Sequence, residues 1–310
     1  MKNSIIVAFV VLTGLNSMYA QQDAQYTQYT LNTMVINPAF AGSANVLSIA
    51  ALHRSQWIGL DGAPETQTFS VNSPISERLG AGFSIVNDNI GDGTAQETFF
   101  DVALSYTIPV SREANLAFGL NVGGNFLNVD FTRLANFGAE SNLPNIDNKF
   151  SPNLGLGAYY YQDKFYAGLS VPSLLETAHF DDSGSGASNL AQERINLYLM
   201  TGYKFTLNQN LVLTPGFLMR AVSGGPLQMD LNTNLIFNDK FSLGAAYRIN
   251  ASVSALFGVK FGESFLLGLA YDTETTTLGS TQFNNGSFEI FLRYDFINRL
   301  NRRNVSGRFF

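Results

Sequence analysis

Residues that could carry acid–base or nucleophilic chemistry are few in this chain. It has two histidines, His53 and His179, and no cysteine. Nothing in the sequence groups either histidine with a serine and an orienting group, as a lipase-type site would need. The phosphate-cradling glycine motifs and the G-x-S-x-G elbow are also missing from the sequence. We therefore expect a protein that is not an enzyme.

One stretch, Asp88 to Gly93, carries oxygen ligands that could hold calcium. It lacks the spacing of an EF-hand and the bidentate Glu that closes one, so a turn rich in Gly and Asn is favoured. The formal net charge of −6 argues against a nucleic-acid partner, which would require a basic patch. We expect no cofactor and no metal.

The segment 288–296 indicates which elements the chain is built from. Large apolar residues at even positions alternate with mostly charged ones, and a period of two places the two sets on opposite faces of a strand. The apolar face would carry Phe288, Ile290, Leu292, Tyr294 and Phe296, and the other face Glu289, Arg293 and Asp295. This pattern is typical of a strand with lipid on one side and a wet lumen on the other.

The same alternation recurs along the chain between turns that are short and long in turn. It predicts an all-β fold, a transmembrane antiparallel β-barrel of about 14 strands, with short periplasmic turns and longer extracellular loops. A soluble β-sandwich is the alternative. Pro215 falls inside a predicted strand and indicates a bulge or a shifted boundary there. The predicted strands are 46–57, 66–73, 79–89, 97–109, 116–130, 151–161, 165–172, 193–206, 211–221, 227–237, 241–249, 253–262, 265–272 and 287–296.

The two ends of the chain lack the alternating pattern of the predicted strands. Residues 1–20 have a Lys, an apolar run and a small-residue end, as a secretory signal peptide has. Residues 21–45 are expected to form a periplasmic or plug segment, residues 46–296 the outer-membrane barrel, and residues 297–310 a basic periplasmic tail. The tail is either merely solvated or a contact for a periplasmic partner, through Arg299, Arg302, Arg303 and Arg308.

Several motifs of the predicted mature chain point to one family. They include Asn37-Pro38-Ala39-Phe40-Ala41-Gly42, Arg54-Ser55-Gln56-Trp57-Ile58-Gly59 and Gly225-Pro226-Leu227-Gln228-Met229-Asp230-Leu231-Asn232. With these motifs the chain resembles the PorP/SprF proteins of the type IX secretion system in Bacteroidota. The likeness spans the predicted mature chain, with Ala24 and Gly307 standing where the family often has proline.

The resemblance implies an outer-membrane component of that secretion system in a Gram-negative, Bacteroidota-type cell. Its implied partners are outer-membrane lipid, the secretion machinery and a cognate secreted surface protein with a C-terminal sorting domain, such as an adhesin used in gliding motility. A passive channel or a transporter for small hydrophobic molecules stays open as the alternative. Arg54, Gln56 and Trp57 are candidate partner contacts, although a lone Trp at a strand end is most simply an interfacial anchor.

Overall fold

The protein folds as one closed antiparallel sheet in a computed structural model that describes residues 25–133, 145–175, 195–222, 225–276, 279 and 284–297. The strands are β1 (Leu47–Ser55), β2 (Glu65–Pro74), β3 (Leu79–Ile90), β4 (Ala95–Pro109), β5 (Ala114–Val129), β6 (Ile146–Gln162), β7 (Phe165–Val171), β8 (Asn196–Tyr203), β9 (Phe205–Asn208), β10 (Leu211–Val222), β11 (Gln228–Phe237), β12 (Phe241–Arg248), β13 (Ser252–Phe261), β14 (Phe265–Glu274) and β15 (Ser287–Phe296). Three short helices, α2 (Thr33–Ile36), η1 (Pro38–Phe40) and η2 (Phe131–Arg133), complete the described elements.

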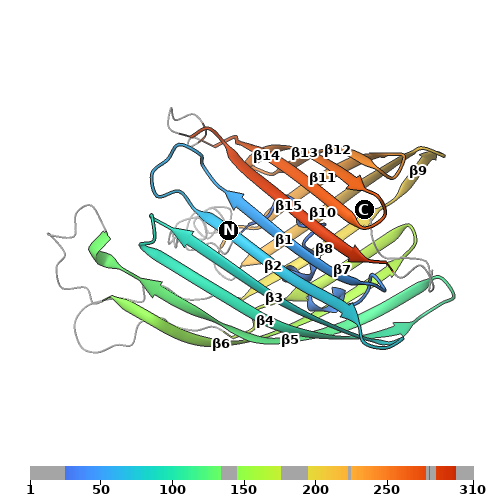
Figure 1. Cartoon of the computed structure of the whole chain (residues 1–310), viewed down its shortest axis with the longest axis horizontal. Helices are drawn as coiled ribbons and strands as arrows, with labels where there is room; N and C mark the ends of the chain where they lie inside the picture. Colours follow the sequence, from blue (N-terminus) through green and yellow to red (C-terminus); the bar gives the residue numbers. More distant parts are fainter. Residues whose placement is uncertain are drawn as a thin grey trace, which may run out of the picture.

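The sheet closes on itself into a barrel (Figure 1). Sequential strands pair antiparallel, and β1 pairs with β15 from Leu47↔Phe296 to Ser55↔Phe288. Strands β8 and β9 are two parts of one strand, because both pair with β10 and only Lys204 separates them. The described barrel therefore has fourteen strands, which confirms the predicted fold and excludes the two stacked sheets of a sandwich.

Side chains alternate across the wall as the sequence predicts. In β15 the aromatic and aliphatic residues at even positions face outward, while Glu289, Arg293 and Asp295 are buried inside. Phe291 is the apolar exception on the inner face, where it is fully buried. Outward Phe, Leu, Val and Tyr side chains recur on every long strand, which gives the apolar outer surface that lipid requires. Among the described residues, no helix combines the length and the apolar character needed to cross a membrane.

The connections alternate in length around the barrel. At one end the turns are 75–78, 110–113, 163–164, 209–210, 238–240 and 262–264, and at the other the loops include 56–64, 130–145, 172–195 and 275–286. Asn238 and Asp239 both adopt left-handed backbone, which these residue types tolerate in tight hairpins. Outer-membrane barrels keep short turns in the periplasm, so the long-loop end faces the cell exterior.

Some strand boundaries differ from the prediction. β6 begins at Ile146 instead of residue 151, because its polar start still pairs with β5 up to Val129. Pro215 lies inside β10, and the ladder toward the preceding strand is interrupted at Lys204 without a change of register. The actual register shift lies elsewhere, between Leu211 and Val212.

Residues 25–45 lie inside the barrel, in the lumen that the inner faces enclose. Most of them are buried, and a buried apolar cluster joins Tyr29, Ile36 and Ala39 of this segment to Tyr159 and Phe291 of the wall. Phe40 packs edge-on against Tyr159 with ring centroids 5.5 Å apart. The hydrophobic core of this protein is therefore the contact between the segment and the barrel wall. We call residues 25–45 the lumen segment.

Candidate functional site

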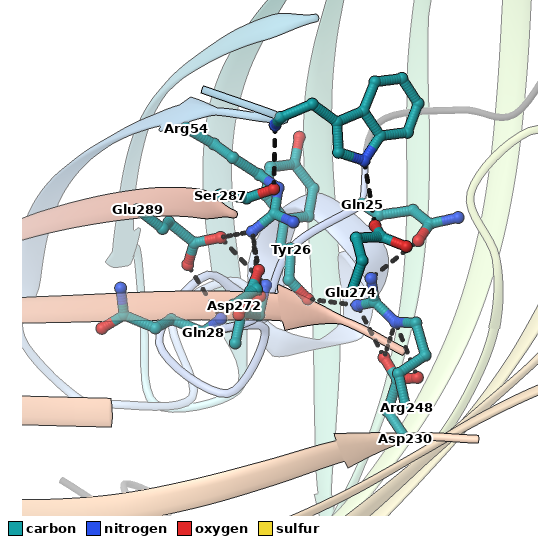
Figure 2. Close-up of polar contacts among 12 residues, drawn as sticks. Gln25, Tyr26, Gln28, Arg54, Asp230, Arg248, Asp272, Glu274, Ser287 and Glu289 are labelled. Atoms are coloured by element: carbon teal, nitrogen blue, oxygen red, sulfur yellow. Dashed lines mark hydrogen bonds and ion pairs between the residues drawn. The ribbon is translucent and has the colours of Figure 1, made fainter. Parts of the chain in front are cut away.

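The most heavily charged part of the lumen lies where β1, β14 and β15 meet at the long-loop end (Figure 2). Arg54 is 2% exposed, and its Nη1 lies 2.6 Å from Asp272 Oδ2 and 3.2 Å from Glu289 Oε2. Arg54 and Glu289 are direct cross-strand partners in the β1–β15 ladder. This ion cluster therefore spans the pair of strands whose contact closes the barrel.

The lumen segment supplies further hydrogen bonds to the ion cluster. The main-chain N–H groups of Thr27 and Gln28 each donate to a Glu289 carboxylate oxygen at 2.9 Å. The Thr27 hydroxyl donates to Asp272 at 2.7 Å and accepts from Arg54 at 2.9 Å. The ion cluster contains one guanidinium and two carboxylates, so it has more negative than positive charge. The backbone N–H groups donate hydrogen bonds that help stabilise the additional carboxylate.

A second clamp holds the start of the lumen segment. Arg248 forms an ion pair with Asp230, its Nη2 lying 2.9 Å from Asp230 Oδ2, and its Nε donates to both carboxylate oxygens at 3.0 and 3.1 Å. The same guanidinium donates to Gln25 Oε1 at 2.8 Å and to the Tyr26 carbonyl at 3.3 Å. Figure 2 shows the planar fork of Arg248 between Asp230 and the segment.

Farther along, a hydroxyl of the wall and an amide side chain of the lumen segment hydrogen-bond the two together. Ser170 Oγ donates to the Ile36 carbonyl at 2.6 Å, and Asn37 Nδ2 donates to the Ala158 carbonyl at 3.1 Å. Inward-facing Gly119 leaves the space for this approach, because a Cβ there would lie 2.1 Å from the Ala39 nitrogen. Polar side chains and an inward-facing glycine thus fit the wall to the backbone of the lumen segment.

Trp57 lies just after β1, at the same mouth of the barrel. Its indole Nε1 donates to Glu274 Oε1 at 3.0 Å, and its backbone N–H donates to Ser287 Oγ at 3.2 Å. Its φ of +44° is uncommon for a bulky residue and points to a position fixed by its surroundings. Ile58 extends this junction, since its N–H donates to the Gly286 carbonyl at 2.8 Å. The loop 56–64 is therefore fastened to the β14–β15 connection.

A groove of about 550 Å³ lies between the loop 56–64 and the outer wall of β1–β3. Apolar Ile58, Leu60 and Phe288 line it together with Gln56. Its carboxylates are Asp61, Glu65 and Asp92, all of them exposed. The groove is thus a mixed apolar and acidic surface on the exterior rim.

The structure separates the three candidate partner contacts. Arg54 points into the lumen, where it is buried in the ion cluster and out of reach of a folded partner. Gln56 and Trp57 stay at the rim, half-buried, and their role in binding a partner stays a prediction. Arg299, Arg302, Arg303 and Arg308 lie outside the described residues.

The other candidates for chemistry remain apart. His53 faces outward and hydrogen-bonds Ser55 at 3.1 Å, while His179 lies outside the described residues. Asp88 accepts a hydrogen bond from Thr66 at 2.6 Å. Within the described part of the chain, no group of three His, Asp or Glu side chains is placed to hold a metal ion.

Sequence reasoning missed the partnership of Asp230, Arg248 and Asp272 with the lumen segment. Their signal was present, since each is a charged residue at an inward position of a strand whose other face is apolar. Such a residue must be paired, because an unpaired buried charge is too costly.

The solved structures to which this chain is similar include distant outer-membrane barrels. The Acinetobacter baumannii outer membrane protein Omp33 has a TM-score of 0.47 at 10% identity, covering 82% of this chain and 100% of that chain. The P. putida toluene transporter TodX has a TM-score of 0.48 at 11% identity, covering 86% and 94%. A Pseudomonas aeruginosa FadL homologue has a TM-score of 0.46 at 12% identity, covering 87% and 94%.

Comparison with curated proteins gave no match. One family model, however, matches residues 18–294, which include every described strand apart from the last two residues of β15. The model is that of the type IX secretion system membrane protein PorP/SprF. The chain belongs to the PorP/SprF family and is an outer-membrane β-barrel of the type IX secretion system.

Proposed function

We propose that this protein is a non-enzymatic component that retains a cognate secreted surface protein at the cell exterior, in contact with the secretion machinery. The observation that carries the proposal is the filled lumen. Two cavities that border the lumen segment measure about 20 and 10 Å³, so each has room for about one water molecule. A wall fitted so closely to its own chain favours a docking role over passage of a solute.

The exterior rim supplies the surface for such docking. The groove beside Gln56 is open to the outside and combines apolar side chains with the carboxylates of Asp61, Glu65 and Asp92. Apolar contact gives affinity, and the acidic side chains of the groove favour a partner of opposite charge. A basic, partly apolar face of the partner's C-terminal sorting domain fits this rim.

The test is retention of the partner in cells that produce Trp57→Ala in place of the natural protein. We expect the variant barrel to assemble normally, as judged by heat-modifiable mobility, while the partner is lost from the envelope into the medium. Phe241→Ala is the matched control, because Phe241 is an exposed aromatic residue at the short-turn end. Equal loss of assembly in both variants would instead assign Trp57 to interfacial anchoring.

The partner itself is identified by co-purification in mild detergent followed by mass spectrometry. Deleting the gene separates the proposed function from the channel alternative. Loss of one surface protein from the envelope supports retention, whereas loss of uptake or conductance with normal secretion contradicts it.

A further inference from the structure

The inner wall of the barrel carries many polar side chains. Those of β2 and β11 include Thr66, Thr68, Ser70, Asn72, Asp230, Asn232 and Asn234, all of them buried. The interior of a channel-forming outer-membrane barrel is polar, whereas a wall that serves only as one side of a protein core is mostly apolar. The wall therefore has the character of a pore lining, although a segment of the same chain occupies the lumen.

One sector of the wall, on β5 and β6, contains polar groups that the protein does not satisfy. Within the described part of the chain, the side-chain oxygens of Asn121, Asn125, Ser151 and Asn153 have no hydrogen-bond partner, although these side chains are buried. Water is the usual partner of such groups in protein interiors. This sector is therefore suited to contact with water.

The lumen segment meets the wall on every side. Its hydrogen bonds reach β1, β2, β4, β6, β7, β11, β12, β14 and β15. Inward glycines add β3 and β5, since a Cβ on Gly80 would lie 2.1 Å from the Ala41 carbonyl oxygen and one on Gly119 would lie 2.1 Å from the Ala39 nitrogen. A segment in contact with strands all round the wall occupies the cross-section of the lumen.

The barrel closes without the help of the lumen segment. The segment forms α2 and η1, and none of its residues belongs to the sheet, whose closing pair runs from Leu47↔Phe296 to Ser55↔Phe288. The ion pairs of Arg54 and Arg248 join strands of the wall to one another. If water replaced the segment, these charged groups would be solvated, so they would not be left buried without a partner. The segment is thus separable from the wall.

We infer from these observations that residues 25–45 are a plug, and that the barrel with this plug displaced is a water-filled pore for ions and small polar solutes. The polar lining supplies the pore, and the contacts around the wall keep it closed. The inference concerns the lumen and does not rest on the proposed retention of a partner at the rim.

Single-channel recording of the full-length protein in planar lipid bilayers tests the inference. The test variant is Gly119→Val, because its side chain would overlap the backbone of the plug at Ala39. Leu120→Val is the matched control, since Leu120 is the next residue of β5 and its side chain is exposed on the lipid-facing side. Heat-modifiable mobility first establishes that each barrel is assembled. We expect the natural protein and Leu120→Val to stay closed, and the fraction of time spent open to rise at least about tenfold in Gly119→Val.

Equal open fractions for Gly119→Val and the natural protein would overturn the inference, whether both are open or both are closed. If Gly119→Val does not assemble, the natural protein is recorded in rising concentrations of urea. The plug lies outside the strand ladder, so urea should release it before the sheet unfolds. Reversible openings below the unfolding concentration support the inference, and a barrel that stays closed up to that concentration overturns it. The retention phenotype of Trp57→Ala is measured separately, so the two proposals fail separately.

Discussion

Replacing Arg54 by Met should destabilise the assembled barrel strongly. The guanidinium lies within 2.6 and 3.2 Å of two carboxylate oxygens, and the three side chains are 3% exposed or less. At a charge separation of about 4 Å and an effective dielectric constant of about 20, one such attraction is worth about 4 kcal/mol. Removing one partner of a buried ion pair typically costs about 3–5 kcal/mol, because the remaining charge stays buried without compensation. We expect a loss of this size in the free energy of unfolding.

Arg133→Met is the matched control. Arg133 pairs with Asp130 at 3.2 Å, but the side chains are 55% and 36% exposed. Exposed pairs contribute about 0–1 kcal/mol because water and salt screen them. The same substitution therefore has a predicted effect several times smaller, even though both arginines also bind other groups of the chain.

The measurement is denaturant unfolding of the purified barrel in detergent, followed by tryptophan fluorescence. Trp57 is the only tryptophan in the chain, so the signal comes from the mouth where Arg54 lies. Equal unfolding free energies for Arg54→Met and Arg133→Met would refute the reasoning. Adding Asp272→Asn and Glu289→Gln to Arg54→Met should recover part of the loss, because both buried charges are then removed. Failure to recover would indicate lost packing of the Arg54 stem instead.

Three further predictions address the lumen, the tail and one loop. Gly119→Val should displace the lumen segment at Ala39 and make it more sensitive to protease, whereas valine at the next, lipid-facing position should not. Removing residues 298–310 should leave heat-modifiable assembly intact, because the alternation ends with β15. The Thr132 hydroxyl, followed by its backbone N–H and further side-chain hydrogen bonds, lowers the pKa of Asp130. The hydrogen bonds that this carboxylate accepts from Thr132 and Arg133 should therefore persist below its unfolded pKa of about 3.9 and be lost only at lower pH, as carboxyl NMR titration would show.

The barrel could be predicted from the sequence because its rule is local. A period of two assigns each side chain to lipid or lumen, and Asn, Asp and Gly mark the hairpins without knowledge of the rest of the fold. The predicted strand boundaries were least accurate where pairing with a neighbouring strand, and not the local sequence pattern, decides where a strand begins or ends. β6 extends to Ile146 because β5 continues beside it, and Lys204 leaves the ladder opposite a strand that contains Pro215.

The site could not be predicted in the same way, because its contacts are long-range. Period two already places Arg54 on the inner face, but its partners Asp272 and Glu289 lie more than 200 positions away in the chain. The sequence alone places Arg54 and Trp57 in one candidate partner contact because they are close in the chain. The strand ends at Ser55, and the left-handed backbone of Trp57 turns the indole toward Glu274 while Arg54 stays below in the lumen.

The buried charges do more than stabilise the barrel. In an apolar lumen, the segment would be held only by the apolar surface area that it buries. Buried apolar area is non-directional and does not determine which residue of the segment faces which residue of the wall. Glu289 accepts two consecutive backbone N–H groups, and Arg248 donates to the Tyr26 carbonyl, so a slip of one residue would leave these buried groups unpaired. The ion clusters therefore set where the lumen segment begins relative to β1, β12 and β15. This fixed position holds Thr27 and Gln28 at the exterior mouth that also carries Trp57, where the retention experiment applies.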